Sequence, residues 1–251
     1  MAKMIKLFDP FIGREEQEKI FQVLKSKFWA SGSGIGNVLK FENQFKKYVG
    51  CKSCVAVNSG TAALNLALSL TDIRNKEVIV PSLTFVSTVH AIKLNQGIPI
   101  FTDIDAKTGC MSTENLQKLI SKKTRVILPV HFGGIPCNIK KINDICNNHN
   151  VVLVEDAAHA AGSTFQRKKI GSHGKFVCFS FHPVKNIAMP TGGLISLNNS
   201  SYKKSKKLLE SRRWCGITNR KNTSYDVREL GNNYYMNEFS AARSCSIKKI
   251  R

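Results

Sequence analysis

The chain has 251 residues, of which 42% are hydrophobic, so it can bury a sizeable core as one large or two small domains. It carries 38 Lys and Arg against 17 Asp and Glu, and such an excess, a formal net charge of +21, can bind nucleic acid by releasing counterions. The basic residues are spread along the chain without a zinc finger, an RRM signature or a basic arm, so we expect a solvated basic surface and no nucleic-acid partner. No run of 18 apolar residues and no signal-peptide segment occurs, which predicts a cytoplasmic protein without membrane contact.

The eight cysteines are expected to be free thiols, as is usual for an intracellular protein. Cys51 and Cys54 form a CxxC motif, which is found in zinc sites and in redox sites. No second CxxC follows, and a four-ligand zinc site needs paired donors. We therefore expect no metal site.

The N-terminal part of the chain is expected to hold two helices. Apolar residues at helical spacing predict a helix over 14–28, with Ile20, Leu24 and Phe28 on one face, and a second helix over 37–49. The segment WASGSGIG between them is rich in glycine and serine, and we interpret it as a loop.

A strand over 54–57 then leads into a helix through the turn NSGTAAL, which covers residues 58–64. This succession places free backbone N–H groups and the positive end of the helix dipole at Gly60, Thr61 and Ala62. The turn therefore predicts a phosphate-binding seat. An ordinary Ser or Thr helix cap is an equally good interpretation of the turn taken alone.

The remaining elements alternate between strands and helices. Phe85 follows a strand over 77–80, and an aromatic residue here either belongs to the core or contacts a ligand. Further strands are expected at 98–102, 125–131, 151–154, 176–181 and 193–197, and helices at 113–120, 138–147 and 202–213. Seven strands separated mostly by helices indicate a doubly wound α/β sheet. No GxGxxG or Walker motif is present, so the nucleotide-cofactor classes lack support.

Two of these strands end in residues that carry chemistry. One buried strand runs into Glu155 and Asp156, and the next delivers Ser180 and then Lys185. An enzyme that uses pyridoxal phosphate (PLP) needs a lysine amine that condenses with the cofactor aldehyde and an aspartate that pairs with the protonated pyridine nitrogen. Taken singly, the aspartate would be a helix N-cap and the lysine a solvated loop residue.

The segments EDAAHAAG, SFHPVK and TGGLIS follow one another in this order, with NSGTAAL nearer the N-terminus. This set resembles the DegT/DnrJ/EryC1/StrS family of PLP-dependent sugar aminotransferases, and the resemblance runs from about Asp9 to the last residue. It implies the large domain of a fold-type I PLP transferase, which is α/β with a mostly parallel seven-stranded sheet and helices on both faces. We assign residues 1–36 to an N-terminal segment packed on this domain and 37–230 to the PLP-binding large domain. Residues 231–251 would be an interface segment and the start of a truncated C-terminal helix.

The resemblance also implies roles for individual residues. Lys185 would carry the cofactor, and Asp156 would keep its pyridine nitrogen protonated. His159 would complete the catalytic set by touching the phenolic oxygen, with a structural histidine as the alternative. Phe85 would lie flat against the pyridine ring. The phosphate would be held by Gly60, Thr61, Ala62 and Ser180.

A further segment, GNNYYMNE, is expected to cross a homodimer interface. In the resembled family an asparagine of this segment touches the cofactor phosphate of the partner, and Asn233 occupies that position here. Tyr235 stands where the family usually has arginine. Asn232 and Asn233 are weak helix formers, and the large side chains that follow favour burial at a contact. The alternative is a loop that packs on its own chain.

The function implied by the resemblance is transfer of an amino group from L-glutamate to a nucleotide-linked keto-sugar, for polysaccharide or glycan biosynthesis. Lys185 favours transfer over the dehydratase branch of the family, which has histidine at that position. Pro190 and Thr191 stand where many members have a Gly-Glu pair, so we expect an altered loop there. Family members continue into a smaller C-terminal domain that we expect to be absent here. That expectation leaves a truncated, PLP-binding but inactive homologue as the alternative.

Overall fold

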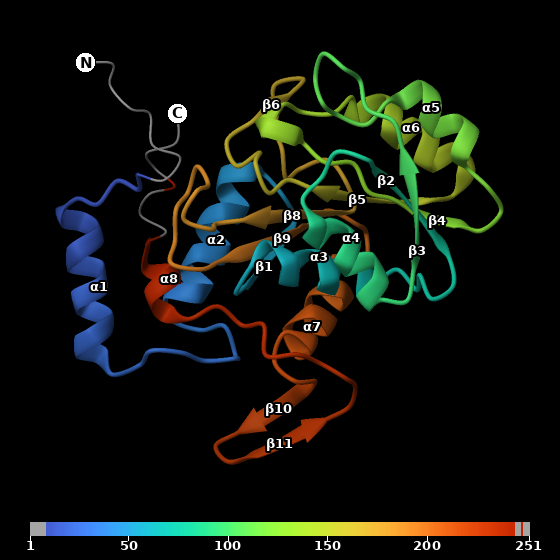
Figure 1. The fold of residues 1–251 in the computed structure, drawn as a ribbon. Helices are drawn as coiled ribbons and strands as arrows, with labels where there is room; N and C mark the ends of the chain where they lie inside the picture. The colour runs from blue at the N-terminus through green and yellow to red at the C-terminus, as the bar shows by residue number, and fades with distance from the viewer. Residues whose placement is uncertain (1–8, 244–246, 248–251) are drawn as a thin grey trace, which may run out of the picture.

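The computed structural model describes residues 9–243 and residue 247, so the outer ends of the predicted 1–36 and 231–251 segments lie outside the described residues. A seven-stranded sheet forms the centre of the fold (Figure 1). Its strands, in the spatial order β1-β9-β8-β5-β4-β2-β3, are Ser53–Val57, Gly193–Leu197, Phe176–Ser180, Val152–Asp156, Thr124–Ile127, Glu77–Pro81 and Ile98–Thr102. The strands from β8 to β3 run parallel, whereas β9 is antiparallel to both of its neighbours. The predicted mostly parallel seven-stranded sheet is confirmed.

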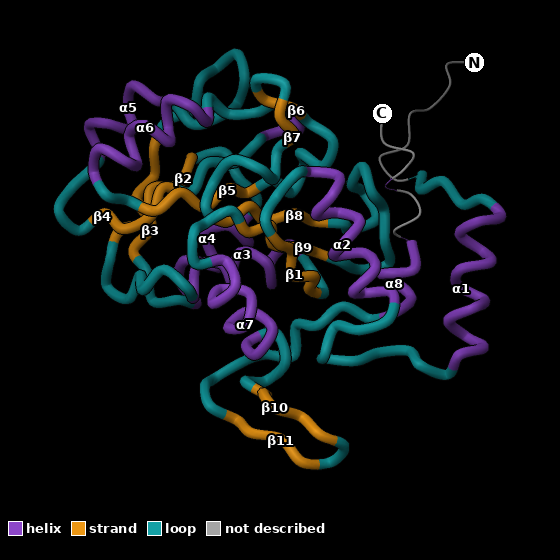
Figure 2. The backbone as a smooth tube through the Cα atoms, turned by 180° about the vertical axis from the view of Figure 1, so that it is seen from behind, coloured by secondary structure: helices purple, strands orange, loops and turns teal. Residues whose placement is uncertain are grey.

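Helices cover both faces of this sheet, as the view from behind also shows (Figure 2). One face packs against α3 (Gly60–Ser69), α4 (Val86–Leu94) and α7 (Tyr202–Arg212). The opposite face packs against α2 (Asn37–Val49) near β1 and against α5 (Thr113–Leu119) and α6 (Ile139–His149) near β4. The sheet is therefore a middle layer, covered by helices on both sides.

Strand β1 shows why the strands of this sheet are apolar on both faces. Val55 and Val57 enter the apolar cluster around α3, whereas Cys54 and Ala56 enter the cluster around α2 on the other face. Alternate side chains of a strand point to opposite faces, so a strand covered on both faces must be apolar throughout. Each fully buried valine of this kind contributes about 1.5–3 kcal/mol relative to an exposed one.

The register of the sheet brings the carboxyl ends of the strands β1, β5 and β8 to the same side of the sheet. Val57, at the end of β1, pairs with Gly193, which also pairs with Ser180 at the end of β8. Asp156, at the end of β5, pairs with Cys178 of β8. The chain leaves β1, β5 and β8 at the same edge, so the start of α3 and the segments after β5 and β8 meet there.

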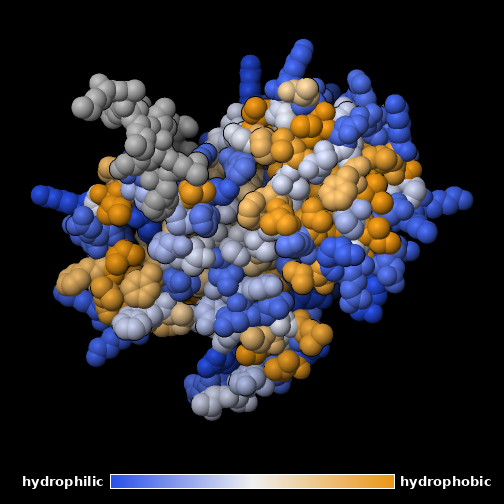
Figure 3. Space-filling model, in the orientation of Figure 1, coloured by the Kyte–Doolittle hydropathy of each residue, from blue (hydrophilic) through white to orange (hydrophobic). Residues whose placement is uncertain are grey.

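Helix α1 (Arg14–Ser26) stands apart from the sheet and packs against the short helix α8 (Glu238–Ala242), as Figure 1 shows. It is shorter than the predicted helix over 14–28, because Lys27 adopts a left-handed conformation with φ of 55°. The predicted apolar face is not buried either: Leu24 is 48% and Phe28 is 38% exposed, while Val23 is buried. Figure 3 shows apolar side chains gathered on the surface over this region.

Two small hairpins and a short turn complete the fold. The polar segment after α7 forms a hairpin of β10 (Ile217–Lys221) and β11 (Ser224–Val227) that projects from the body of the protein (Figure 1). Strands β6 (Thr164–Phe165) and β7 (Lys168–Lys169) form the other hairpin, and η1 (Phe132–Gly134) is a single 3-10 turn.

All seven cysteines in the described range are free thiols, and the sulfur atoms of Cys51 and Cys54 are 3.3 Å apart. Within residues 9–243 and 247, no group of three or more His, Cys, Asp or Glu is arranged to hold a metal ion. No helix of the same residues is long and apolar enough to cross a membrane. A cytoplasmic location stays a prediction of the sequence.

Candidate active site

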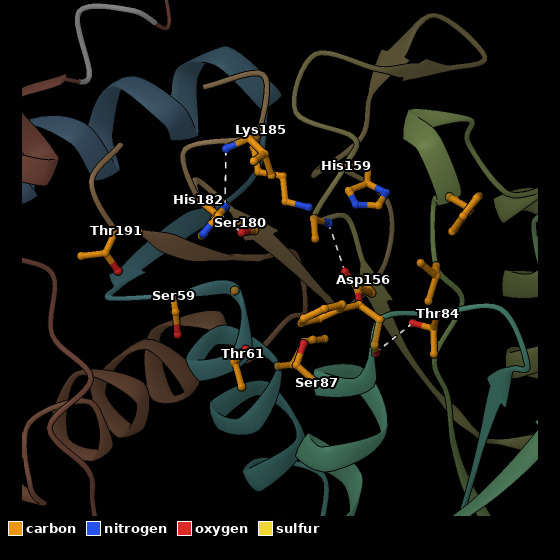
Figure 4. A pocket seen from close by; sticks show the side chains of 18 residues that line it. Ser59, Thr61, Thr84, Ser87, Asp156, His159, Ser180, His182, Lys185 and Thr191 are labelled. Atoms are coloured by element: carbon orange, nitrogen blue, oxygen red, sulfur yellow. Dashed lines mark hydrogen bonds between the residues drawn. The ribbon is translucent and has the colours of Figure 1, made fainter. Parts of the chain in front are cut away.

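A cavity of about 480 Å³ lies at the edge of the sheet where β1, β5 and β8 end. Its walls come from the first turn of α3, the segment between β2 and α4, the end of β5 and the segment between β8 and β9 (Figure 4). The predicted site residues that line it are Gly60, Thr61, Phe85, Asp156, His159, Ser180 and Lys185. The fold thus brings together segments that are far apart in the sequence. Ala62 and Asn233 are not part of the wall.

Asp156 is held in place through both of its carboxylate oxygens. Thr88 donates its hydroxyl hydrogen to Oδ2 at 2.8 Å, and the backbone N–H of Ala158 donates to Oδ1 at 3.0 Å. Thr84 in turn donates to the Thr88 hydroxyl at 2.8 Å. The carboxylate keeps lone pairs on both oxygens for a further donor, and its orientation is set before any ligand arrives.

Thr84, which lines the cavity, and Thr88, which holds Asp156, are residues of the site that the sequence analysis did not select. They lie four residues apart around the start of α4, a spacing that puts two side chains on one side of a helix turn. The segment SLTFVST follows strand β2 in the sequence, so its hydroxyl residues were a usable signal for a polar cavity wall. Their partner Asp156 lies 68 residues further along the chain, and only the fold reveals it.

Lys185 enters the cavity from the turn that follows β8. Its backbone N–H donates to the carbonyl of His182 at 2.8 Å, and the buried residues Ile187 and Met189 anchor the chain that follows. Figure 4 shows the side chain directed into the cavity on the side of His159 and Asp156. Burial lowers the pKa of Lys185 below its usual 10.5, although the nearby Asp156 carboxylate acts in the opposite direction.

His159 lies beside the lysine and is tied to the turn η1. The backbone N–H of Gly133 donates to Nδ1 of His159 at 3.2 Å, and the Phe132 ring packs edge-on against the imidazole with centroids 6.0 Å apart. Burial and then the positive charge of Lys185 lower the pKa of His159 below its usual 6.5, against the effect of Asp156. The lowered pKa favours the neutral imidazole.

The first turn of α3 forms the seat at the other end of the cavity. Ser59, which the sequence analysis did not select, caps the helix because its hydroxyl accepts the N–H of Ala62 at 3.1 Å. The N–H of Ala62 is used by this cap and its side chain is buried, so a contact between Ala62 and a phosphate stays a prediction. The N–H groups of Gly60 and Thr61 remain, because the first N–H groups of a helix have no partner within it.

The seat is narrow because Gly60 lies against β8. A Cβ atom at Gly60 would be 2.8 Å from the Cβ atom of Ser180, closer than side chains approach in proteins. The glycine thus allows the helix start and the Ser180 hydroxyl to face the same small volume. Such a set of N–H and O–H donors at a helix N-terminus suits a phosphate group.

Of two further predicted residues, Phe85 lines the cavity and Asn233 does not. Phe85 lines the cavity and is 71% exposed, so the alternative of an ordinary core aromatic is excluded. Asn233 has an exposed side chain outside the cavity. Its carbonyl accepts a hydrogen bond from the side chain of Asn58 at 3.2 Å, next to the α3 turn. A role for Asn233 across a subunit interface stays a prediction.

The chemistry of these donors and acceptors fits PLP. The α3 turn with Ser180 suits the phosphate, the free lone pairs of Asp156 suit the protonated ring nitrogen, and Lys185 supplies an amine between them. The exposed aromatic face of Phe85 suits the flat ring. The individual roles stay predictions, but one cavity now holds the lysine, the aspartate, the histidine and the phosphate-seat residues Gly60, Thr61 and Ser180 that they require.

Comparisons with known proteins give a consistent result. The family model of the DegT/DnrJ/EryC1/StrS aminotransferase family matches residues 10–248. The spore coat polysaccharide biosynthesis protein SpsC of Bacillus subtilis (strain 168) is 34% identical over 248 residues, which cover 96% of this chain and 62% of that protein. GDP-perosamine synthase of Escherichia coli O157:H7 is 36% identical over 200 residues, which cover 79% of this chain and 54% of that protein.

Solved structures agree with the sequence relatives. Helicobacter pylori PseC, an aminotransferase involved in the biosynthesis of pseudoaminic acid, superimposes with a TM-score of 0.90 at 27% identity. The matched region covers 98% of this chain and 66% of that one. The chain spans about three fifths of the length of curated relatives such as SpsC, at 62%.

Proposed function

The chain belongs to the DegT/DnrJ/EryC1/StrS aminotransferase family, and from that premise we propose that it moves an amino group from L-glutamate to a nucleotide-linked keto-sugar. The aminated sugar would enter polysaccharide or glycan biosynthesis. The observation that carries the proposal is the single cavity in which Lys185 and Asp156 converge, with the N-terminal turn of α3 at its other end.

PLP is the cofactor of this family, and when bound it supplies an aldehyde for a lysine and a ring that accepts electrons from the reacting carbon. Lys185 would hold the cofactor covalently, and Asp156 would hold its ring nitrogen. The N–H groups of Gly60 and Thr61, together with the Ser180 hydroxyl, would hold the phosphate.

Lys185 is also suited to move a proton during the reaction. Only the uncharged amine can accept a proton, and burial lowers the pKa of Lys185 so that a larger fraction is uncharged at a given pH. In the first half-reaction the Nζ atom would take a proton from the α-carbon of the amino donor and deliver it to the cofactor, and in the second it would take a proton back from the cofactor and deliver it to the acceptor carbon of the sugar. The Asp156 carboxylate raises the pKa of Lys185 against the effect of burial. The amine can therefore also hold a proton after it has accepted one and before it delivers it.

The substrate class rests on the relatives. The name of GDP-perosamine synthase connects that enzyme with a nucleotide-linked sugar, and PseC is described as acting in the biosynthesis of pseudoaminic acid. A cavity of about 480 Å³ is in the range of small-molecule sites in proteins. These observations support a keto-sugar acceptor, and the sugar and the nucleotide are to be identified by assay.

Cofactor attachment gives the first test. The protein is reconstituted with PLP, reduced with borohydride and digested, and the modified residue is identified by mass spectrometry. We expect modification at Lys185, and we expect Lys185→Ala to keep PLP at most non-covalently. Fixation through another lysine would overturn the assignment.

Transfer gives the second test. Glutamate and a panel of keto-sugar nucleotides are added, and release of 2-oxoglutarate is followed. Release with at least one acceptor supports the proposed function. PLP attached at Lys185 without any transfer is the result expected of the inactive homologue.

We also propose that the protein works as a homodimer in which Asn233 serves the phosphate seat of the partner. The exposed position of the Asn233 side chain outside its own cavity supports this proposal. The test mixes Lys185→Ala protein with Asn233→Ala protein. In the mixed dimer one site has lost both residues, whereas the other has both intact, so mixing should restore activity. A monomeric protein with full PLP occupancy would rule the proposal out.

A further inference from the structure

A buried pair of ionisable side chains lies directly behind the cavity. Glu155 precedes Asp156 on β5, and its side chain points to the other face of the sheet. Oε2 of Glu155 is 2.8 Å from Nε2 of His131, and both side chains are fully buried. Oε1 of Glu155 accepts the backbone N–H of Gly174. The residues that were assigned to the candidate site do not include this pair.

The contacts of His131 determine which of its nitrogens carries the hydrogen. Nδ1 accepts the backbone N–H of Cys137 at 3.1 Å, so Nδ1 has a lone pair and no hydrogen. In a neutral imidazole the hydrogen is then on Nε2, and it is donated to Glu155. The backbone N–H of His131 also donates to the carbonyl of Asp156 at 3.0 Å. His131 is thus bound to the end of β5 through both main chain and side chain.

These bonds hold the turn η1, which connects the pair to the cavity. His131 and Cys137 flank the turn, and its first residue, Phe132, lines the cavity. The turn is tied from the other side by Ser163, whose hydroxyl donates to the carbonyl of Gly134 at 2.7 Å. With both sides fixed, the N–H of Gly133 points at Nδ1 of His159 at 3.2 Å.

We propose that Glu155 and His131 are positioning residues that hold His159 in the neutral form with its hydrogen on Nε2. The bond from Gly133 occupies Nδ1, so the remaining nitrogen of His159 can only donate. His159 therefore acts as a hydrogen-bond donor to an anionic oxygen in the cavity and does not accept protons in the reaction. The proposal deepens the proposed function and rests on it for the identity of that oxygen, the phenolic oxygen of PLP.

The surroundings of His159 favour the same form. A protonated imidazole would carry hydrogens on both nitrogens and would lose the bond from Gly133. The ionisable groups that face the ring across the cavity are Lys185, which disfavours a second positive charge, and Asp156, which favours it. Burial adds to the effect of Lys185, so the neutral donor form prevails.

The first measurement uses the cofactor-free wild-type chain. Nitrogen-15 labelled histidine gives NMR signals that distinguish a ring nitrogen with hydrogen from one without. We expect His159 to carry hydrogen on Nε2 alone, and the signals of the exposed His90 and His149 serve as references within the same spectrum. Hydrogen on Nδ1 of His159 would overturn the proposal whatever the variants do.

The second measurement uses Glu155→Gln. The amide offers a single oxygen to the two donors from His131 and Gly174, so one of the two bonds is lost. The loosened turn weakens the neutral hydrogen bond from Gly133 to Nδ1 of His159. Loss of a neutral hydrogen bond shifts an equilibrium by about fivefold, so we expect the ratio of the two neutral forms of His159 to move toward the Nδ1–H form by about that factor. Ser163→Ala, which loosens the same turn, should shift the ratio in the same direction and keeps the proposal testable if Glu155→Gln does not fold.

A matched control separates positioning from a general loss of stability. Glu42 is another buried carboxylate, paired with Arg213 at 2.7 Å and remote from η1. Glu42→Gln should lower stability while leaving the signals of His159 as in the wild type. An unchanged His159 in folded Glu155→Gln, or an equal change in Glu42→Gln, would overturn the proposal. Because these signals are measured without PLP, failure of borohydride to label Lys185 would count against the proposed function alone.

Discussion

Replacing Thr88 by valine removes a fully buried hydroxyl that contacts Asp156. Valine has nearly the same shape, so the substitution leaves no cavity. It takes away the donor to Asp156 Oδ2 at 2.8 Å and the acceptor for the Thr84 hydroxyl at 2.8 Å. Thr84 is only half-buried, so water can replace its lost partner. The main consequence therefore falls on the carboxylate.

The structure allows the size of this effect to be worked out. A hydrogen bond to a charged group contributes about 1.5–3 kcal/mol, compared with about 1 kcal/mol for a neutral one. We expect Thr88→Val to lower the free energy of unfolding of the cofactor-free protein by about 2 kcal/mol. Without the bond from Thr88, the Asp156 carboxylate is less well oriented and must be ordered when PLP binds. If this ordering costs about 1.4 kcal/mol of binding free energy, PLP binds about tenfold more weakly.

Urea unfolding and a PLP titration measure the two quantities. The matched control is Thr71→Val, because the buried Thr71 hydroxyl donates at 2.6 Å to the neutral carbonyl of Leu68. The control should lose about 1 kcal/mol of stability and bind PLP as the wild type does. Equal losses in the two variants, or wild-type PLP affinity in Thr88→Val, would refute the reasoning about Asp156.

Three other substitutions test separate parts of the site. Lys185→Met should raise the melting temperature of the cofactor-free protein at pH 7, because the lowered pKa makes the charged amine less favourable in the folded state than in the unfolded one. The gain in melting temperature should vanish as the pH rises through the usual lysine pKa of 10.5, because the amine is then uncharged in both states. An equal gain at pH 7 and above pH 10.5 would contradict this explanation. Gly60→Ala would force its Cβ atom to within 2.8 Å of the Ser180 Cβ atom, so we expect a loss of about 1–3 kcal/mol in urea unfolding and weaker PLP binding. Glu155→Ala leaves the buried N–H donors of His131 and Gly174 without an acceptor, each at a cost of about 1–3 kcal/mol, so we expect urea unfolding to show a loss of about 2–6 kcal/mol. Wild-type stability of this variant would contradict that expectation.

Much of the candidate site could be predicted because its parts are local in the sequence. A strand, a turn and a helix start within a few residues define the seat at Gly60 and Thr61, and a lysine a few residues after β8 must lie near the same edge as Ser180. The apolar runs that are covered on both faces also predicted the central strands and their mostly parallel arrangement. Local order therefore identified the segments that form the cavity.

Contacts between segments were decided by the tertiary structure alone. Glu155 and Asp156 are adjacent carboxylates, and the sequence does not show that one is buried against His131 while the other faces the cavity. Their partners lie 24 residues away for Glu155 and 68 residues away for Asp156, where Thr88 donates. The sheet order β5-β4-β2 places these segments side by side although other elements separate them in the chain. A residue type indicates which bonds a side chain can make, whereas the register of neighbouring strands and the direction of each side chain determine which partner it meets.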